Sequence, residues 1–105
     1  MSYNLKFKLM LALEIENFKA NGKEPYNVFI SPKTHKNILN DKSLIIIDND
    51  NKILNLVLNV SIYIPDELVI LAVDLNKHYD IAANSYTPWY LTYANTLLYE
   101  VYFYL

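Results

Sequence analysis

Residues 5–18, "LKFKLMLALEIENF", fit two secondary structures. Apolar residues stand at every second position, which is the period of a half-buried strand. The residue types, however, are Leu, Lys, Met, Ala and Glu, which are strong helix formers. Gly22, the single glycine of the chain, favours the helix. It lies where a helix needs a left-handed residue just past its end, with a lysine on each side and a proline soon after. The sequence therefore predicts a helix over residues 4–21.

This helix is apolar on two sides, so it needs two packing partners. One face carries Phe7, Leu11, Ile15 and Phe18, and a second carries Leu5, Leu9, Ala12 and Leu13. One face is expected to lie on a sheet. An exposed second face would predict a partner.

The segment "YNVFISPKTHKNILND" predicts a strand that leads into a helix. Residues 26–30 are rich in aromatic and β-branched types. Ser31 can cap a helix that begins at Pro32, where the missing N–H costs nothing. We expect Ile38 and Leu39 to anchor this short helix, which the following Asn-Asp pair ends.

The middle of the chain predicts antiparallel strands. "SLIIIDNDNKILNL" has the composition of a hairpin with a polar turn at residues 48–52. "IPDEL" predicts a turn, and residues 68–73 are apolar throughout, as in a strand buried on both faces. The second hairpin arm alternates, with six residues expected to face inward: Leu54, Leu56, Leu58, Val60, Ile62 and Ile64.

The C-terminal third predicts a long loop after Asp74, with a short strand around residues 79–82. Alternation in "NTLLYEVYFYL" favours a final strand, and the competing interpretation is a helix that begins at Thr87 and Pro88. The 105 residues predict one domain, and 53% hydrophobic residues predict a compact core. The predicted class is α+β: a mixed, largely antiparallel sheet of about five strands, with the N-terminal helix and the second short helix packed on it.

Charge argues against nucleic acid as the main ligand. Residues 1–42 carry seven Lys and four acids, a net charge of +3, whereas residues 43–105 carry two Lys and seven acids, a net charge of -5. The chain has no Arg for bidentate contacts to phosphate or guanine. A nucleic-acid binder remains a minor hypothesis, with four lysines as its contacts: Lys6, Lys8, Lys33 and Lys36.

Catalytic and metal sites have few candidate residues. The chain has no cysteine and two histidines. His78 with Asp74 and Asp80 could form a small metal-dependent hydrolase or nuclease site. Asp48 and neighbouring residues resemble the start of a calcium loop, but that loop's glycine and final glutamate are missing, so a solvated turn fits better. Ser31 is explained as a cap. One glycine excludes the phosphate and dinucleotide fingerprints, so we expect no cofactor.

Aromatic residues crowd the end of the chain. Tyrosine and tryptophan supply large contact area together with a polar group, and they are enriched at protein interfaces. Tyrosines that close the edge of a small core explain the pattern equally well. The predicted interface combines the N-terminal helix with the C-terminal segment through Leu9, Leu13, Trp89, Tyr90, Tyr99, Tyr102 and Tyr104.

The segments "GKEPYNVFISPKTHKNIL" and "LNVSIYIPDELVILAVDLN" together resemble small phage proteins over roughly residues 9–76. They also resemble, more distantly, a stretch of the major capsid proteins of the HK97 fold. The resemblance implies a viral origin and a scaffold of helices and sheet, and it implies no catalytic residue.

These patterns together predict a small, virus-encoded, non-enzymatic protein that works through protein contacts. Its partner would be a second copy, giving a homo-oligomer, or a host or virion protein. No apolar stretch approaches the roughly 18 residues of a membrane helix, and no signal peptide is evident. The expected location is the host cytoplasm or the virion.

Overall fold

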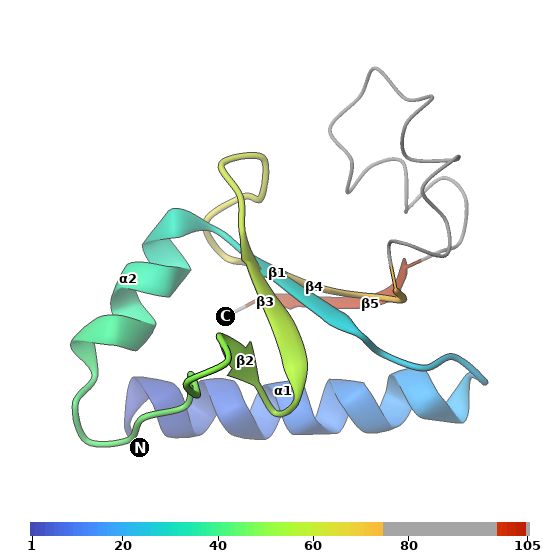
Figure 1. Ribbon diagram of the computed structural model, residues 1–105, viewed down its shortest axis with the longest axis horizontal. Helices are drawn as coiled ribbons and strands as arrows, with labels where there is room; N and C mark the ends of the chain where they lie inside the picture. The colour runs from blue at the N-terminus through green and yellow to red at the C-terminus, as the bar shows by residue number, and fades with distance from the viewer. Residues whose placement is uncertain (75–98, 105) are drawn as a thin grey trace.

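The computed structural model describes residues 1–74 and, as backbone, residues 99–104. Two helices and a mixed sheet form an α+β fold, so this part of the sequence prediction is confirmed (Figure 1). The strand order across the sheet is β2-β3-β1-β4-β5. β1 and β3 are parallel, and the other three neighbouring pairs are antiparallel. The elements in chain order are α1 Tyr3–Ala20, β1 Asn27–Ile30, α2 Pro32–Asn40, β2 Lys52–Ile53, β3 Leu56–Val60, β4 Leu68–Ala72 and β5 Tyr99–Tyr104.

Both ends of α1 are capped by the residues around them. Ser2 is the N-cap, and its hydroxyl accepts a hydrogen bond of 3.1 Å from the Leu5 N–H. At the other end Gly22 has a φ of 82°, and its N–H donates to the Lys19 carbonyl at 2.9 Å. The Lys23 N–H reaches back to the Phe18 carbonyl at 3.4 Å, which completes a Schellman motif. The helix predicted over residues 4–21 is confirmed, together with the role of its glycine.

The larger core lies between α1 and one face of the sheet. α1 runs along the sheet, and α2 stands at one end, next to the N-terminal end of α1 (Figure 1). Phe7, Leu11 and Phe18 of α1 are fully buried in this core. Ile38 of α2 is also buried there, whereas Leu39, predicted to anchor the same helix, is 49% exposed. The buried contacts of this 9-residue helix therefore come from Ile38 together with the polar Thr34.

The strands β1 and β4 are apolar on both faces. Val28 and Ile30 belong to the core under α1, and Phe29 belongs to a second buried cluster on the opposite face. All five residues of β4 are buried, as predicted for residues 68–73, because β4 lies between β1 and β5 inside the sheet.

The hairpin predicted for residues 43–56 was wrong. Residues 44–47 form no strand, and the hairpin instead joins β2 to β3 through Leu54 and Asn55, which have φ values of 50° and 66°. Strand propensity in the isoleucine run is overridden because the Leu44 carbonyl accepts a hydrogen bond from the Asn4 side chain instead of a ladder bond. The predicted polar turn is a separate loop, in which one Asp48 carboxylate oxygen accepts from the N–H groups of Asp50 and Lys52.

The inward alternation after Leu54 also ends early. Leu56 and Leu58 are buried as predicted, but Val60 is 43% exposed and Ile62 is 80% exposed. β3 stops at Val60, and the Tyr63 N–H donates to the Ser61 hydroxyl in a turn, which rotates the side chains away from the core. Ile64 returns to the second buried cluster.

The C-terminal strand prediction is confirmed where the chain is described. β5 is antiparallel to β4, with Tyr104 opposite Leu68. The predicted strand at residues 79–82 and the alternative helix start at Thr87 and Pro88 lie outside the described residues.

Candidate protein-interaction surface

The outward side of α1 carries a row of exposed leucines. Leu5, Leu9 and Leu13, here called the outer leucine row, are 38%, 52% and 62% exposed. They are spaced four residues apart, which places them along one line on a helix, on the side away from the buried face. These leucines include two of the predicted interface residues.

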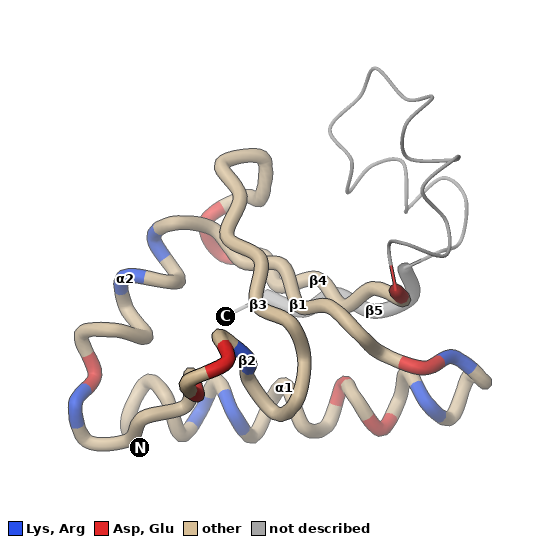
Figure 2. Tube along the Cα trace, in the orientation of Figure 1, with Lys and Arg blue, Asp and Glu red and all other residues tan. Residues whose placement is uncertain are grey.

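Four of the five charged residues on α1 are separated by sign along the helix axis, and the fifth, Lys19, lies in the last turn. Lys6 and Lys8 lie in the N-terminal half, and Glu14 and Glu16 lie in the C-terminal half. Figure 2 shows these two blue and two red positions following each other along the tube. Among the described residues none of the four takes part in an ion pair. Lys6 and Glu16 flank the outer leucine row, so the outward side of α1 combines apolar surface with charges that the described residues do not neutralise.

The tyrosine-rich β5 forms one border of the sheet. Its described pairing is with β4 alone, and α1 lies against it. Tyr99, Tyr102 and Tyr104 are all positions on this edge strand. The remaining predicted interface residues, Trp89 and Tyr90, lie outside the described residues.

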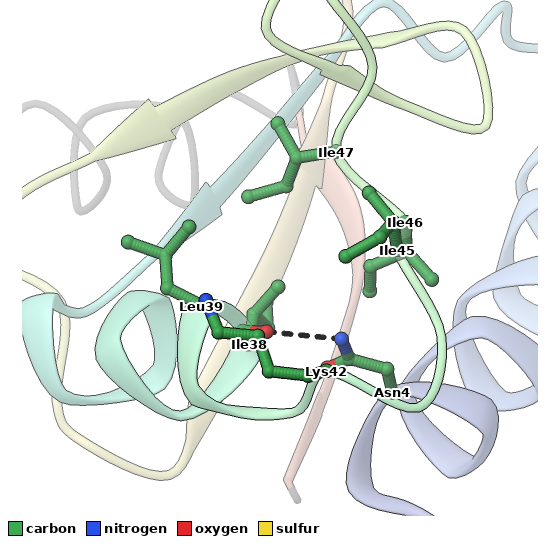
Figure 3. Close-up of a pocket in the computed structure, with 7 residues that line it drawn as sticks. All are labelled: Asn4, Ile38, Leu39, Lys42, Ile45, Ile46 and Ile47. Atoms are coloured by element: carbon green, nitrogen blue, oxygen red, sulfur yellow. Dashed lines mark hydrogen bonds between the residues drawn. The ribbon is translucent and has the colours of Figure 1, made fainter.

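A pocket of about 180 Å³ opens where α1, α2 and the following loop meet (Figure 3). Its walls are mostly aliphatic, and Ile45 at the pocket is 72% exposed. The lining residues are Asn4, Ile38, Leu39, Lys42, Ile45, Ile46 and Ile47.

Asn4 is the one buried polar residue of α1 and joins three segments. Its side-chain amide group donates to the carbonyl oxygens of Ile38, Asp41 and Leu44, at 2.9, 3.3 and 2.7 Å. Its Oδ1 is buried and accepts no hydrogen bond from the described residues. Reversing the amide would set its oxygen against three carbonyl oxygens, so the hydrogen bonds fix the orientation.

Asp41 closes the same junction from the α2 side. Its carboxylate accepts from the Asn4 backbone N–H at 2.8 Å and from the Ser43 hydroxyl at 2.6 Å. The hydrogen bond from the Ser43 side chain, followed by that from the Asn4 backbone, lowers the pKa of Asp41 from 3.8 to about 2. Asp41 thus supplies a capping acceptor to the first turn of α1 from 37 residues away.

Asn4 was not among the predicted functional residues, although the sequence contains a signal for it. Asn4 falls in phase with the buried series Phe7, Leu11, Ile15 and Phe18. A polar residue in the buried phase of a helix must find hydrogen-bond partners, so it marks a fixed junction with another segment.

The rival catalytic site is not assembled by the described residues. Asp74 ends the described N-terminal part of the chain, and His78 and Asp80 lie outside it. Among the residues that the structure describes, no three His, Asp or Glu side chains gather as metal ligands do. The Ser31 hydroxyl is engaged as the predicted cap, since it accepts from the Thr34 N–H at 3.1 Å.

The four lysines proposed for nucleic-acid binding are divided between two helices. Lys6 and Lys8 lie on α1, and Lys33 and Lys36 lie on α2, where the Lys33 ammonium is 3.9 Å from the Glu67 carboxylate. Within the described parts of the chain, no helix has the length and apolar character needed to cross a bilayer.

Comparison with known proteins gives no match. No protein-family model fits the chain, and neither a curated protein nor a solved structure matches it. The resemblance of residues 9–76 to phage proteins stays a prediction.

Proposed function

We propose that this protein acts without chemistry of its own, through protein–protein contacts, and that its partner on α1 is a second copy of the chain. The outer leucine row carries the proposal, because it offers aligned apolar side chains on a rigid helix whose opposite face is fixed in the core. From the predicted resemblance to phage proteins, we further propose that the protein is encoded by a virus and is located in the host cytoplasm or the virion.

The exposed area allows an estimate of strength. Fully burying a leucine stabilises by about 1.5–3 kcal/mol, so half-exposed leucines gain about 1 kcal/mol each. Six leucines in a pair of chains would contribute about 6 kcal/mol, which is comparable with the roughly 4–15 kcal/mol of freedom lost on association. We therefore expect weak, concentration-dependent association that also depends on polar contacts around the leucines.

Sedimentation velocity over a concentration series tests the proposal. We expect the mass of the unmodified chain to rise toward a dimer at high concentration. Leu9→Asp and Leu13→Asp should keep the chain monomeric, because each places a carboxylate in the contact. Ile62→Asp is the matched control, since Ile62 is a more exposed aliphatic residue far from α1 in the sequence. It should behave like the unmodified chain.

A photo-crosslinking amino acid at position 9, compared with one at position 36 of α2, identifies the partner. Crosslinked pairs of this chain from position 9 support self-assembly. Crosslinks to another protein would retain a contact function but replace the partner. A chain that stays monomeric at the highest concentration, and forms no crosslink from position 9, refutes the proposal.

A further inference from the structure

We infer that the second copy binds α1 antiparallel, across a two-fold axis that meets the outward side of the helix at the level of Leu11. This inference rests on the proposed self-association and specifies its geometry. Leu11 is fully buried and points into the core, so the direction opposite to it is the midline of the outward side. A two-fold axis on that midline brings each residue beside the one equally far from Leu11 on the other side.

Two pairs of outward residues are arranged symmetrically about this axis, whereas Leu5 would meet Asn17. Leu9 and Leu13 are each two positions from Leu11, and at 3.6 residues per turn they lie about 20° on either side of the midline. Lys6 and Glu16 are each five positions away and lie about 40° on either side. In an antiparallel pair, Leu9 of one copy therefore meets Leu13 of the other, and Lys6 meets Glu16.

Charge selects this arrangement over the parallel one. The antiparallel pair brings the Lys6 ammonium to the Glu16 carboxylate twice, once on each side of the axis. A parallel pair would bring Lys6 to Lys6 and Glu16 to Glu16, which is unfavourable. The antiparallel arrangement also opposes the two helix dipoles.

Interactions within α1 do not explain the positions of Lys6 and Glu16. Lys6 lies in the first turn, where the helix dipole disfavours a cation, and α1 has no acid in that turn. No oppositely charged residue lies three or four positions from Lys6, and Glu16 has only Lys19, three positions later, with which it forms no ion pair. An antiparallel partner helix would place an opposite charge beside each of them.

A charge-exchange experiment tests the geometry. Lys6→Glu makes both outward positions acidic, and Glu16→Lys makes both basic, so each variant alone should dimerise at least about tenfold more weakly than the unmodified chain. Mixing the two variants should give a heterodimer within about threefold of the original affinity, because both ion pairs re-form, one with its original polarity and one with its polarity reversed. The double variant Lys6→Glu with Glu16→Lys should regain the homodimer.

Lys8→Glu is the matched control, because it makes the same charge change on the same helix about 120° from the midline. It should leave the dissociation constant within about twofold. Native mass spectrometry of the mixture, with one chain isotope-labelled, counts homodimers and heterodimers directly, and circular dichroism verifies that each variant is folded.

Each result separates this inference from the proposed function. Self-association that is unchanged by Lys6→Glu and Glu16→Lys but abolished by Leu9→Asp overturns the antiparallel geometry and leaves the leucine contact standing. Lack of a heterodimer in the mixture likewise overturns the geometry. Dimers that are insensitive to both sets of substitutions overturn the proposal that α1 forms the contact between the two copies.

Discussion

Replacing Asn4 by alanine should destabilise the fold more than replacing any other polar residue of α1 by alanine. The amide group of Asn4 has two hydrogens for the carbonyl oxygens of Ile38, Asp41 and Leu44. Asn4→Ala therefore removes about two net hydrogen bonds, worth about 1 kcal/mol each, and leaves the buried Ile38 carbonyl without this donor. We expect a loss of about 2–4 kcal/mol, a large fraction of the roughly 5–15 kcal/mol that stabilises a domain.

Urea unfolding, followed by circular dichroism at low protein concentration, measures this loss. Asn17→Ala is the matched control, because Asn17 is an exposed asparagine on the same helix. It should change the free energy of unfolding by less than about 0.5 kcal/mol. The hydrogen bond from the Asn4 backbone N–H to Asp41 is kept in Asn4→Ala, so the experiment isolates the side chain.

Asn4→Asp provides a second test, because the helix dipole and the three carbonyl oxygens would change the stability in opposite directions. An acid in the first turn of an exposed helix would stabilise it by about 0.3–1 kcal/mol through the helix dipole. Here the new carboxylate would face three carbonyl oxygens, so we expect Asn4→Asp to be less stable than Asn4→Ala at neutral pH. If Asn4→Ala matched Asn17→Ala, or if Asn4→Asp stabilised the protein, the junction would not have the role described.

Two further predictions concern Asp41 and Gly22. The pKa of Asp41 is lower in the folded chain, about 2 against 3.8, so its ionised form stabilises the fold above about pH 4, and this contribution is lost as the pH falls from about 4 toward 2. The difference in urea midpoint between the unmodified chain and Asp41→Asn should close over that interval, and a constant difference would contradict the hydrogen-bond assignment. Gly22→Ala should cost about 1–2 kcal/mol, because the φ of 82° is strained for alanine while no atom lies within 4 Å of the added Cβ. Gly22→Asn should cost less, since asparagine tolerates this conformation; equal losses from the two variants would argue for a different cause.

Local signals predicted the elements whose ends are set by neighbouring residues. The Ser31 hydroxyl and Pro32 start α2, and Gly22 ends α1, as caps do in many proteins. These predictions succeed because a cap bonds to backbone groups within a few positions of itself. The sequence likewise predicts a second apolar face of α1 that includes Leu9 and Leu13, and both side chains are exposed.

Long-range contacts explain why part of the predictions for residues 44–64 was wrong. The isoleucine run has strand propensity, yet the Leu44 carbonyl bonds to Asn4, 40 positions earlier in the chain. The two-residue turn at Leu54 and Asn55 lacks the usual glycine, and Leu54 packs against the core. Packing can offset the strain of a left-handed leucine, which costs about 1–2 kcal/mol.

The sequence by itself determined where the helices begin and end, because caps and turn residues act on neighbouring backbone groups. The tertiary structure decided that β1 lies parallel to β3 at the centre of the sheet, that Asn4 joins α1 to α2, and which apolar face of α1 stays exposed. These outcomes depend on residues 30 to 40 positions apart competing for the same hydrogen bonds and the same buried volume. Patterns among residues close together in the sequence do not predict the result of that competition.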